Sequence, residues 1–422
     1  MRNIVLITLD SVRADHCSFM GYHRETTPTL DRMARRGLYF ENAIVASLPT
    51  TPSMASVFTA TYPTANAVPL IPYEWRKELN IKRTLAELLS EYGYSTGAFH
   101  SNPAVSQFFG LNKGFRDFHY LGIEKENPTL NLIKNFFKWL KKEERWAHWE
   151  KYYNKIISWI ENIKEPFFIW ILLIDTHVPY FPPKKYRIWG ARSTLYLLYL
   201  NYKISKIDWN KEQFNESEDI LNKIEKKKII GAYDSSIRYA DEFIKRLWKD
   251  LEKYDPIFIV HADHGDGFSE HGFYWHPPRL YEEIIHVPLV IYNADLKGRI
   301  TKPVSLLGLA PTILELVKYK NNNFGSKTLL DDSEKWVITQ ANVNNKIRLA
   351  VRLKDWKYIT GQKEYNELYN LKKDPQEQEN VIDEYPDLVK EFKKIAGRHI
   401  RQELEKINIK RAIKGSIKYE KF

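Results

Sequence analysis

The 422-residue sequence contains a single cysteine, Cys17, which excludes an internal disulfide and is compatible with a reducing compartment. It lacks an apolar run near the roughly 18 residues that a membrane-spanning helix needs. Its first ten residues lack the layout of a secretory signal peptide. Zinc-finger spacings, RNP-like aromatic runs, internal repeats and low-complexity segments are also absent from it. We therefore expect a cytoplasmic protein with no transmembrane segment and no nucleic-acid partner.

The composition is that of a chain with a substantial core, because hydrophobic residues make up 43% and aromatic residues 14%. The net charge of +11 suits nucleic acid, a membrane surface or a small anionic substrate, and does not choose among them. Most of the lysines lie along predicted helices, where they form solvated faces. The length fits one large α/β domain with a smaller addition, and a homo-oligomer is compatible with it.

Two apolar, β-branched segments predict strands that are buried on both faces, Asn3 to Leu9 and Ile257 to His261. Each is followed by an acidic residue, Asp10 after the first and Asp263, with His264, after the second. Because the carboxyl ends of parallel strands meet at one edge of a sheet, we expect these side chains to form a metal site there. The plainer alternative is that Asp263 caps a helix and His264 is a core histidine. The nearby Asp15 and His16 are expected to anchor a loop.

The segment Ala46 to Thr64 predicts a helix with Pro52 at its first position and Thr50 or Thr51 beside the N-cap. A helix N-terminus offers free N–H groups to phosphate or sulfate oxygens. A threonine hydroxyl here becomes a nucleophile if a metal ion lowers its pKa. The alternative is an ordinary threonine cap.

Further along the chain the patterns predict two helical insertions and a change of architecture. The insertions span about 125–165 and 184–228, and we expect them to determine substrate choice. A catalytic domain over 1–330 is followed by a C-terminal α+β subdomain over 331–422, with short strands, a helix beginning near Pro386 and a basic helical tail.

Together the motifs resemble the sulfatase family of the alkaline-phosphatase-like superfamily. The resemblance covers nearly the whole chain and is carried, in order, by NIVLITLDSVRADH, PTTPSMASVFTATYP, FGLNKGFRDF, LLIDTHVPYFPP, YDSSIRYADEFIKRL, ADHGDGFSEHG and YEEIIHVPLVIY. It implies a three-layer α/β sandwich, with a mostly parallel sheet between helices and a small C-terminal antiparallel sheet with a helix. The implied activity is that of a metal-dependent hydrolase of sulfate or phosphate esters, acting on a small anionic ester.

The resemblance also implies roles for individual residues. The metal ligands are Asp10, Asp263, His264 and Thr50. Thr50 takes the position of the family's nucleophile, because Pro52 and Ser53 match the Pro-Ser that follows it. His177 matches a histidine that protonates the leaving group. The expected substrate contacts are His276, near an oxyanion-binding lysine of the family, and His100 and Asn102 at the rim of the site. Ser11, Tyr281 and Glu282 are expected to hold the metal ligands in position without binding the metal ion themselves.

The sequence departs from the family at several of these positions. Sulfatases oxidise a Cys or Ser to formylglycine, which Thr50 cannot become, so no formylglycine is expected. Met54 replaces the family's arginine, Ser11 replaces a metal-binding aspartate, and Asn66-Ala67 replaces a His-Gly pair. Threonine is the nucleophile of related phosphodiesterases and phosphotransferases. The resemblance therefore favours phosphodiester or phosphonate chemistry over sulfate hydrolysis.

Several alternatives stay open at this point. Thr51 competes with Thr50 as the nucleophile. The oxygen-rich ligand set suits one Mn²⁺, Zn²⁺ or Ca²⁺ ion, and a second metal would need the group Asp175, His177, His271 and His276. Two alternatives to hydrolysis also stay open. One is transfer of a phospho-headgroup to a glycan or lipid, and the other is a catalytically silent protein that binds an anionic glycan.

Overall fold

A computed structural model describes residues 1–63, 83–122, 148–207, 220–320, 324–333, 335–343, 346–361 and 366–413. Most of the first predicted insertion, 125–165, lies outside these residues, as do 208–219 of the second and the end of the basic tail. Within the described residues, no helix is both long enough and apolar enough to cross a membrane.

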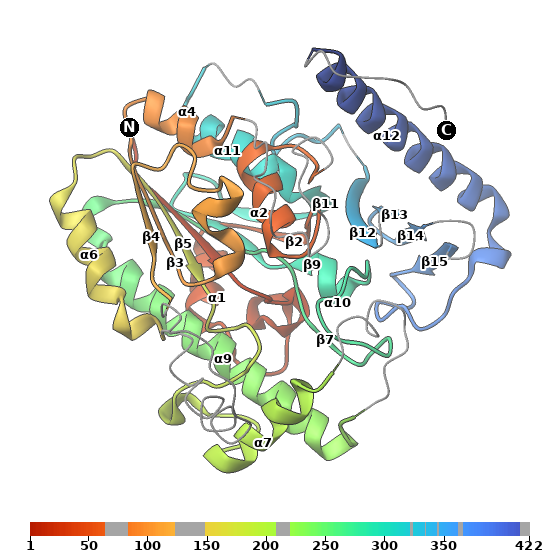
Figure 1. Cartoon of the computed structure of the whole chain (residues 1–422), viewed down its shortest axis with the longest axis horizontal. Coiled ribbons are helices and arrows are strands. Elements are labelled where there is room, and N and C mark those ends of the chain that lie inside the picture. Colours follow the sequence, from red (N-terminus) through yellow and green to blue (C-terminus); the bar gives the residue numbers. More distant parts are fainter. Residues whose placement is uncertain are drawn as a thin grey trace.

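The centre of the molecule is a nine-stranded sheet with the strand order β11-β2-β10-β6-β1-β5-β3-β4, and β9 pairs with β2 (Figure 1). β1, β3, β4, β5 and β6 run parallel to one another, whereas β10 runs antiparallel to its neighbours β6 and β2. The strands are β1 Ile4–Leu9, β2 Leu38–Ile44, β3 Ser95–His100, β4 Asp117–Tyr120, β5 Phe167–Leu173, β6 Ile257–Ala262, β9 His286–Val287, β10 Leu289–Tyr292 and β11 Gly298–Ser305.

The central strands β1, β5 and β6 are completely buried, as their unbroken apolar sequences require. Helices cover both faces of the sheet (Figure 1). On one face, α1 packs against α9 and β10; on the other, α2, α4 and α11 contact one another. The helices are α1 Pro28–Arg36, α2 Thr50–Thr59, α4 Leu85–Glu91, α6 Tyr153–Asn162, α7 Thr194–Ile204, α9 Lys223–Asp250, α10 Glu282–Ile285 and α11 Leu309–Leu316. The predicted three-layer architecture is confirmed.

The C-terminal part forms a separate antiparallel sheet of β12 Val337–Val343, β13 Lys346–Arg352, β14 Trp356–Thr360 and β15 Asn366–Asn370. Helix α12, Pro386–Ile413, packs on β13 and β14. The core between them contains Val351 and Tyr358 from the sheet and Phe392 from the helix. A small ribbon of β7, Gly267–Phe268, and β8, Tyr274–Trp275, follows β6.

Candidate active site

Asp10 and Asp263 lie side by side because β1 and β6 are parallel and in register, with Leu9 opposite Ala262. Each aspartate is the first residue after its strand. One donor atom from each of Asp10, Asp263 and His264 lies within 4.8 Å of the other two. All three side chains are fully buried. Among the described residues, no other set of three or more His, Cys, Asp or Glu side chains converges in this way.

Ser11 holds the two aspartates in place through a left-handed backbone conformation, with φ of 61°. Non-glycine residues adopt this conformation rarely, and such strain is concentrated at functional sites. The Ser11 N–H donates to Asp263 Oδ1 at 3.0 Å, and its hydroxyl donates to Asp10 Oδ1 at 3.0 Å. The expected support from Ser11 corresponds to these two hydrogen bonds.

The charges of this cluster fit a cation. Burial and the neighbouring Asp263 raise the pKa of Asp10, and burial raises the pKa of Asp263 to about 6. Oδ2 of Asp263 is buried without a hydrogen-bond partner. Two adjacent buried carboxylates with an unsatisfied oxygen are costly unless a positive charge compensates them. Asp10, Asp263 and His264 therefore suit a divalent metal ion.

Thr50 begins helix α2 beside this cluster, and its Oγ1 lies 3.1 Å from Nε2 of His264. The expected position of Pro52 at the start of the helix is wrong by two residues, because the helix begins at Thr50 and follows Pro49. Ser53, one turn further on, donates its hydroxyl to the carbonyl of Asp263 at 2.7 Å. This bond joins the helix to the loop that carries two of the ligands.

Thr51 faces elsewhere, because its hydroxyl donates to the carbonyl of Ala104 at 2.5 Å. Of the two threonines, Thr50 is the one in contact with a metal-ligand candidate.

The imidazole of His264 has a defined tautomer. Its Nδ1 lies 2.9 Å from the carbonyl oxygen of Gly265, which can only accept, so Nδ1 carries the proton. Burial and His276 lower the pKa of His264 to about 3, so the ring is neutral. Its Nε2 lone pair therefore faces the Thr50 hydroxyl, where it accepts a proton or a metal ion.

The backbone of α10 packs tightly against the loop that carries His264. The amide of Gly265 donates to the carbonyl of Ile284 at 2.8 Å. A Cβ at Gly265 would lie 2.0 Å from the carbonyl oxygen of Glu283, so only glycine fits at this position.

His177 and His276 lie close together, with ring centroids 5.1 Å apart. The ring of His276 is also 4.3 Å from the ring of His264. Burial opposes the charged form of His177, but Asp10 and Asp266 outweigh it and raise the pKa of this histidine. Burial and His177 lower the pKa of His276 to about 3. The surroundings thus raise the pKa of His177 and lower the pKa of His276.

Asp266 is a member of the candidate site that the sequence reasoning missed. Its Oδ1 lies 2.8 Å from Nδ1 of His276, and its Oδ2 accepts the hydroxyl of Tyr180. The side chain is fully buried, which raises its pKa to about 6. The sequence did offer one indication of this role, because Asp266 lies three residues after Asp263 in the loop that follows β6. Arg13 secures this loop by donating to the carbonyl of Asp266 at 3.1 Å.

The side chains expected at the rim lie inside the protein, so their expected position is wrong. His100 is fully buried at the end of β3, and Asn102 is 5% exposed. Asn102 donates to Asp10 Oδ2 at 2.6 Å, which fixes the orientation of a ligand. β5 lies between β3 and β1 in the sheet, so the loop after β3 comes close enough for Asn102 to reach Asp10 after β1.

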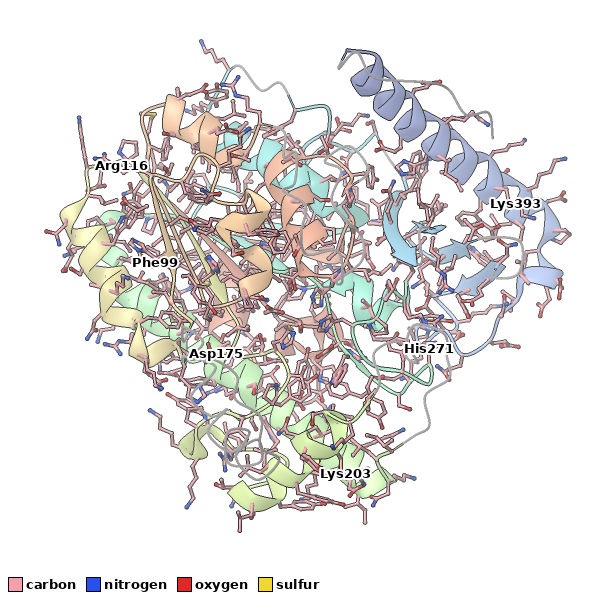
Figure 2. The ribbon with its side chains drawn as sticks, viewed as in Figure 1. Phe99, Arg116, Asp175, Lys203, His271 and Lys393 are labelled. Carbon is pink, nitrogen blue, oxygen red and sulfur yellow. The ribbon has the colours of Figure 1, made fainter. Side chains whose placement is uncertain are left out.

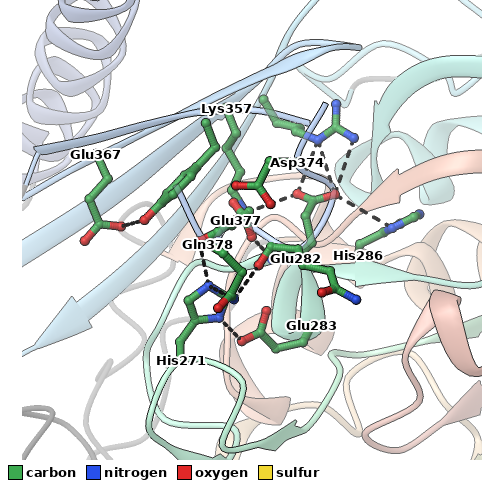
Figure 3. A network of polar contacts seen from close by, with 12 residues as sticks. His271, Glu282, Glu283, His286, Lys357, Glu367, Asp374, Glu377 and Gln378 are labelled. Atoms are coloured by element: carbon green, nitrogen blue, oxygen red, sulfur yellow. Dashed lines mark hydrogen bonds and ion pairs between the residues drawn. The ribbon is translucent and has the colours of Figure 1, made fainter. Parts of the chain in front are cut away.

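Tyr281 contacts the C-terminal sheet through Tyr369 of β15, with ring centroids 6.2 Å apart. Glu282 contacts the same sheet (Figure 3). Glu282 is paired with Arg352 at 3.2 Å and with Lys357 at 3.1 Å. The ring of Tyr281 stacks on His271 at 3.8 Å. Their support for the metal ligands is therefore indirect and runs through the backbone of α10.

His271 belongs to the same interface, where its Nδ1 lies 2.6 Å from Glu283 (Figure 3). Asp175 instead faces His148, at 3.3 Å. The four side chains considered for a second metal therefore do not converge, because only His177 and His276 lie close together. Of the expected loop anchors, Asp15 pairs with Arg13 of its own loop at 2.8 Å, and His16 pairs with Asp234 of α9 at 2.7 Å.

A parallel sheet with a buried acidic cluster at its carboxyl edge, beside a helix N-terminus with a hydroxyl group, is an arrangement that suits a metal ion and an anionic ligand. The comparisons with known proteins agree. The family model described as Sulfatase matches residues 2–319. The chain is 26% identical to an arylsulfatase of Clostridium perfringens, over 93% of both chains, and 24% identical to human arylsulfatase K, over 92% of this chain and 80% of that one.

Solved structures have the same fold. The phosphonate monoester hydrolase of Agrobacterium radiobacter has a TM-score of 0.73 at 16% identity, with 96% of each chain covered. BT4656, solved with its substrate D-glucosamine-2-N,6-O-disulfate, has a TM-score of 0.72 at 18% identity, with 96% of this chain and 98% of that one covered. The chain belongs to the sulfatase family and is an ester hydrolase, as the sequence predicted.

Proposed function

We propose that this protein hydrolyses a phosphodiester or a phosphonate monoester, with Thr50 as the nucleophile. The observation that carries the proposal is the 3.1 Å separation of Thr50 Oγ1 from Nε2 of His264, one of the three candidate metal ligands. The Thr50 oxygen also lies at the N-terminus of α2, where unpaired backbone N–H groups favour an anion.

In the first step, Oγ1 of Thr50 attacks phosphorus and the bond from phosphorus to the leaving alcohol breaks. His177 gives the leaving oxygen its proton in this proposal, which is supported by the raised pKa of this histidine, since Asp10 and Asp266 favour its charged form. The neutral His177 then takes a proton from water, which attacks the phospho-threonine and releases Thr50. Thr50 attacks as its alkoxide, its proton having been released to solvent beforehand, and it is expelled as the alkoxide in the second step. With the proton that His177 gives and regains, the protons balance over the two steps.

The buried set Asp10, Asp263 and His264 would hold one divalent ion, Mn²⁺, Zn²⁺ or Ca²⁺, which would polarise the ester oxygens and lower the pKa of the Thr50 hydroxyl. His264 offers a single lone pair, at Nε2. Metal binding there therefore requires the Thr50 hydroxyl to direct its proton away from His264.

Threonine favours phosphorus over sulfur for a chemical reason. A gem-diol nucleophile expels sulfate by collapsing to an aldehyde, and the extra methyl group of threonine rules that route out. A phospho-threonine, by contrast, can be hydrolysed by attack of water at phosphorus. The two phosphonate monoester hydrolases among the structural neighbours, with TM-scores of 0.73 and 0.71, support this choice, although most of the named relatives are sulfatases.

The test is turnover of the metal-loaded protein on matched nitrophenyl esters: sulfate, phosphate monoester, phosphodiester and phosphonate monoester. We expect preference for the phosphodiester or phosphonate, abolished in Thr50→Ala and retained in Thr51→Ala. Preference for the sulfate ester would refute the proposal. A single burst of nitrophenol that continues only when an acceptor alcohol is added would indicate transfer in place of hydrolysis.

A further inference from the structure

Helix α7 exposes an apolar and aromatic face to solvent. Leu195 is 76% exposed, Tyr199 48%, Tyr202 39% and Tyr196 36%. The opposite face of the helix, with Leu197, Leu200 and Ile204, is buried, and α7 packs on α9. The exposed residues are therefore additional to the core face that anchors this helix. A contiguous exposed patch of this kind marks an interaction site more often than an isolated exposed side chain does. We call these four residues the α7 outer face.

Two rings of the α7 outer face are stacked, and two of its rings have a lysine ammonium group over them. Tyr196 and Tyr199 are stacked, with centroids 6.1 Å apart and planes at 19°. Nζ of Lys203 lies 5.6 Å from the ring centroid of Tyr199, and Nζ of Lys206 lies 4.9 Å from that of Tyr202. Lys203 also pairs with Glu225 at 2.8 Å, whereas Lys206 is exposed.

The stretch that carries α7 has a strong charge bias. No Asp or Glu occurs between Thr176 and Ile207, whereas six Lys or Arg residues do. Of these, Lys184, Lys185, Arg192 and Lys206 are exposed. Lys185 pairs with Glu150 at 3.7 Å and Lys203 pairs with Glu225 at 2.8 Å, so the excess positive charge of this surface comes from Lys184, Arg192 and Lys206. This excess favours a polyanionic partner.

Helix α7 is also attached to the active-site loop. Asn201, on its buried face, accepts the backbone N–H of Tyr180 at 2.9 Å and donates to the carbonyl of the same residue at 3.2 Å. Tyr180 lies three residues after His177, and its hydroxyl donates to Asp266. In Figure 2, Lys203 marks α7 at the lower edge of the molecule.

We propose that the α7 outer face binds a polyanionic polysaccharide, with sugar rings stacked on the tyrosines and anionic substituents held by the neighbouring lysine and arginine side chains. Flat tyrosine rings suit the apolar faces of sugar rings, and the acid-free basic stretch suits repeated negative charges. A long substrate of this class would contact α7 while one of its esters occupies the site beside His177. The proposal rests on the chain's hydrolysing an anionic ester, and does not depend on Thr50 or on a choice between phosphorus and sulfur.

The test measures binding of the full-length protein to immobilised dextran sulfate, with neutral dextran and polyglutamate as probes of sugar and of charge alone. We expect the double variant Tyr196→Ala/Tyr199→Ala to bind dextran sulfate about tenfold more weakly, because each aromatic contact contributes on the order of a threefold change in affinity. Polyglutamate is expected to bind weakly and to be insensitive to the double variant. An unchanged affinity for dextran sulfate, or an equal loss for polyglutamate, would overturn the proposal.

Controls separate this inference from the rest of the account. Phe108→Ala removes a ring that is 42% exposed outside α7, and we expect it to leave binding unchanged. Thr50→Ala is expected to bind dextran sulfate like the wild type, so loss of ester turnover and loss of polysaccharide binding are distinguishable. Unfolding temperatures verify that each variant is folded. Tyrosine-dependent binding to anionic phospholipid vesicles, without binding to dextran sulfate, would assign the surface to a membrane and contradict the proposal.

Discussion

Nε2 of His264 lies 3.1 Å from Oγ1 of Thr50, although 213 residues separate them in the chain. The contact arises because β6 delivers His264 to the sheet edge at which α2 begins. Since Nδ1 of His264 donates to its neighbouring carbonyl, the ring has one lone pair, and it faces the hydroxyl. The proposed nucleophile, a candidate metal ligand and a helix N-terminus thus lie next to one another.

The first prediction concerns the metal site. Removal of divalent ions should abolish ester turnover, and restoring Mn²⁺, Zn²⁺ or Ca²⁺ should recover it. Binding should also raise the unfolding temperature, because saturation at about 100 times Kd stabilises a protein by about 2.7 kcal/mol. Differential scanning calorimetry with and without metal measures this. In Asp263→Asn the metal-dependent shift should disappear, and a shift equal to that of the wild type would show that the ion binds elsewhere.

The second prediction concerns Asp266 as a positioning residue. Its carboxylate fixes the proton of His276 on Nδ1. Asp266→Asn presents an amide to that nitrogen and favours the other tautomer, so we expect turnover to fall about 10- to 100-fold. Tyr180→Phe keeps the carboxylate and should cost less. Nitrogen chemical shifts of His276 report the tautomer directly; an unchanged tautomer in Asp266→Asn, whatever the rate, would contradict this role.

The third prediction concerns the interface between α10 and the C-terminal sheet (Figure 3). Lys357 is fully buried and lies 2.5 Å from Glu377 and 3.1 Å from Glu282. Lys357→Met leaves buried carboxylates without their shared partner, so we expect a loss of about 3–5 kcal/mol in the free energy of unfolding. The exposed pair of Lys253 and Glu161 is the control, because Lys253→Met should cost below about 1 kcal/mol. Denaturant titration compares them, and equal losses would refute the prediction.

The fourth prediction is a pH effect on stability away from the active site. Asp241 accepts the N–H groups of Thr29 and Leu30 at the start of α1, and burial raises its pKa to about 6. A raised pKa favours the protonated form in the folded state. The stability from this group is therefore complete below the unfolded pKa of 3.8 and is lost as the pH rises through about 6.

The loss amounts to about 3 kcal/mol, at 1.36 kcal/mol per pKa unit. Asp241→Asn should remove this part of the pH dependence, while its amide oxygen still accepts the two N–H groups. Unfolding free energies measured between pH 4 and about 7 test this. Parallel curves for wild type and variant would show that the Asp241 carboxyl does not titrate in that range.

The sequence predicted the features that depend on local pattern. The apolar runs of β1 and β6 identify buried parallel strands, so the convergence of Asp10 and Asp263 follows from the geometry of a sheet. The helix boundary at Pro386 follows from proline at a first turn. These predictions need no knowledge of distant contacts.

Other features depend on contacts between distant segments, which a single sequence does not encode locally. Glu282 has its partners on β13 and β14, and the resemblance that implied a supporting role for it did not indicate these contacts. Asn102 reaches Asp10 only because β3, β5 and β1 are consecutive in the sheet. The role of Asp266 depends on the ribbon that brings His276 back over it.

The central claim, that Thr50 carries the reacting group, is tested most directly by trapping the intermediate. The metal-loaded protein is mixed with a phosphonate or phosphodiester nitrophenyl ester, quenched in acid within one turnover and digested for mass spectrometry. We predict that the peptide containing Thr50 gains one phosphoryl or phosphonyl group and that fragmentation places it on Thr50. The adduct should be absent from Thr50→Ala and present in Thr51→Ala. An adduct on any other residue, or rapid turnover by Thr50→Ala, would contradict the account.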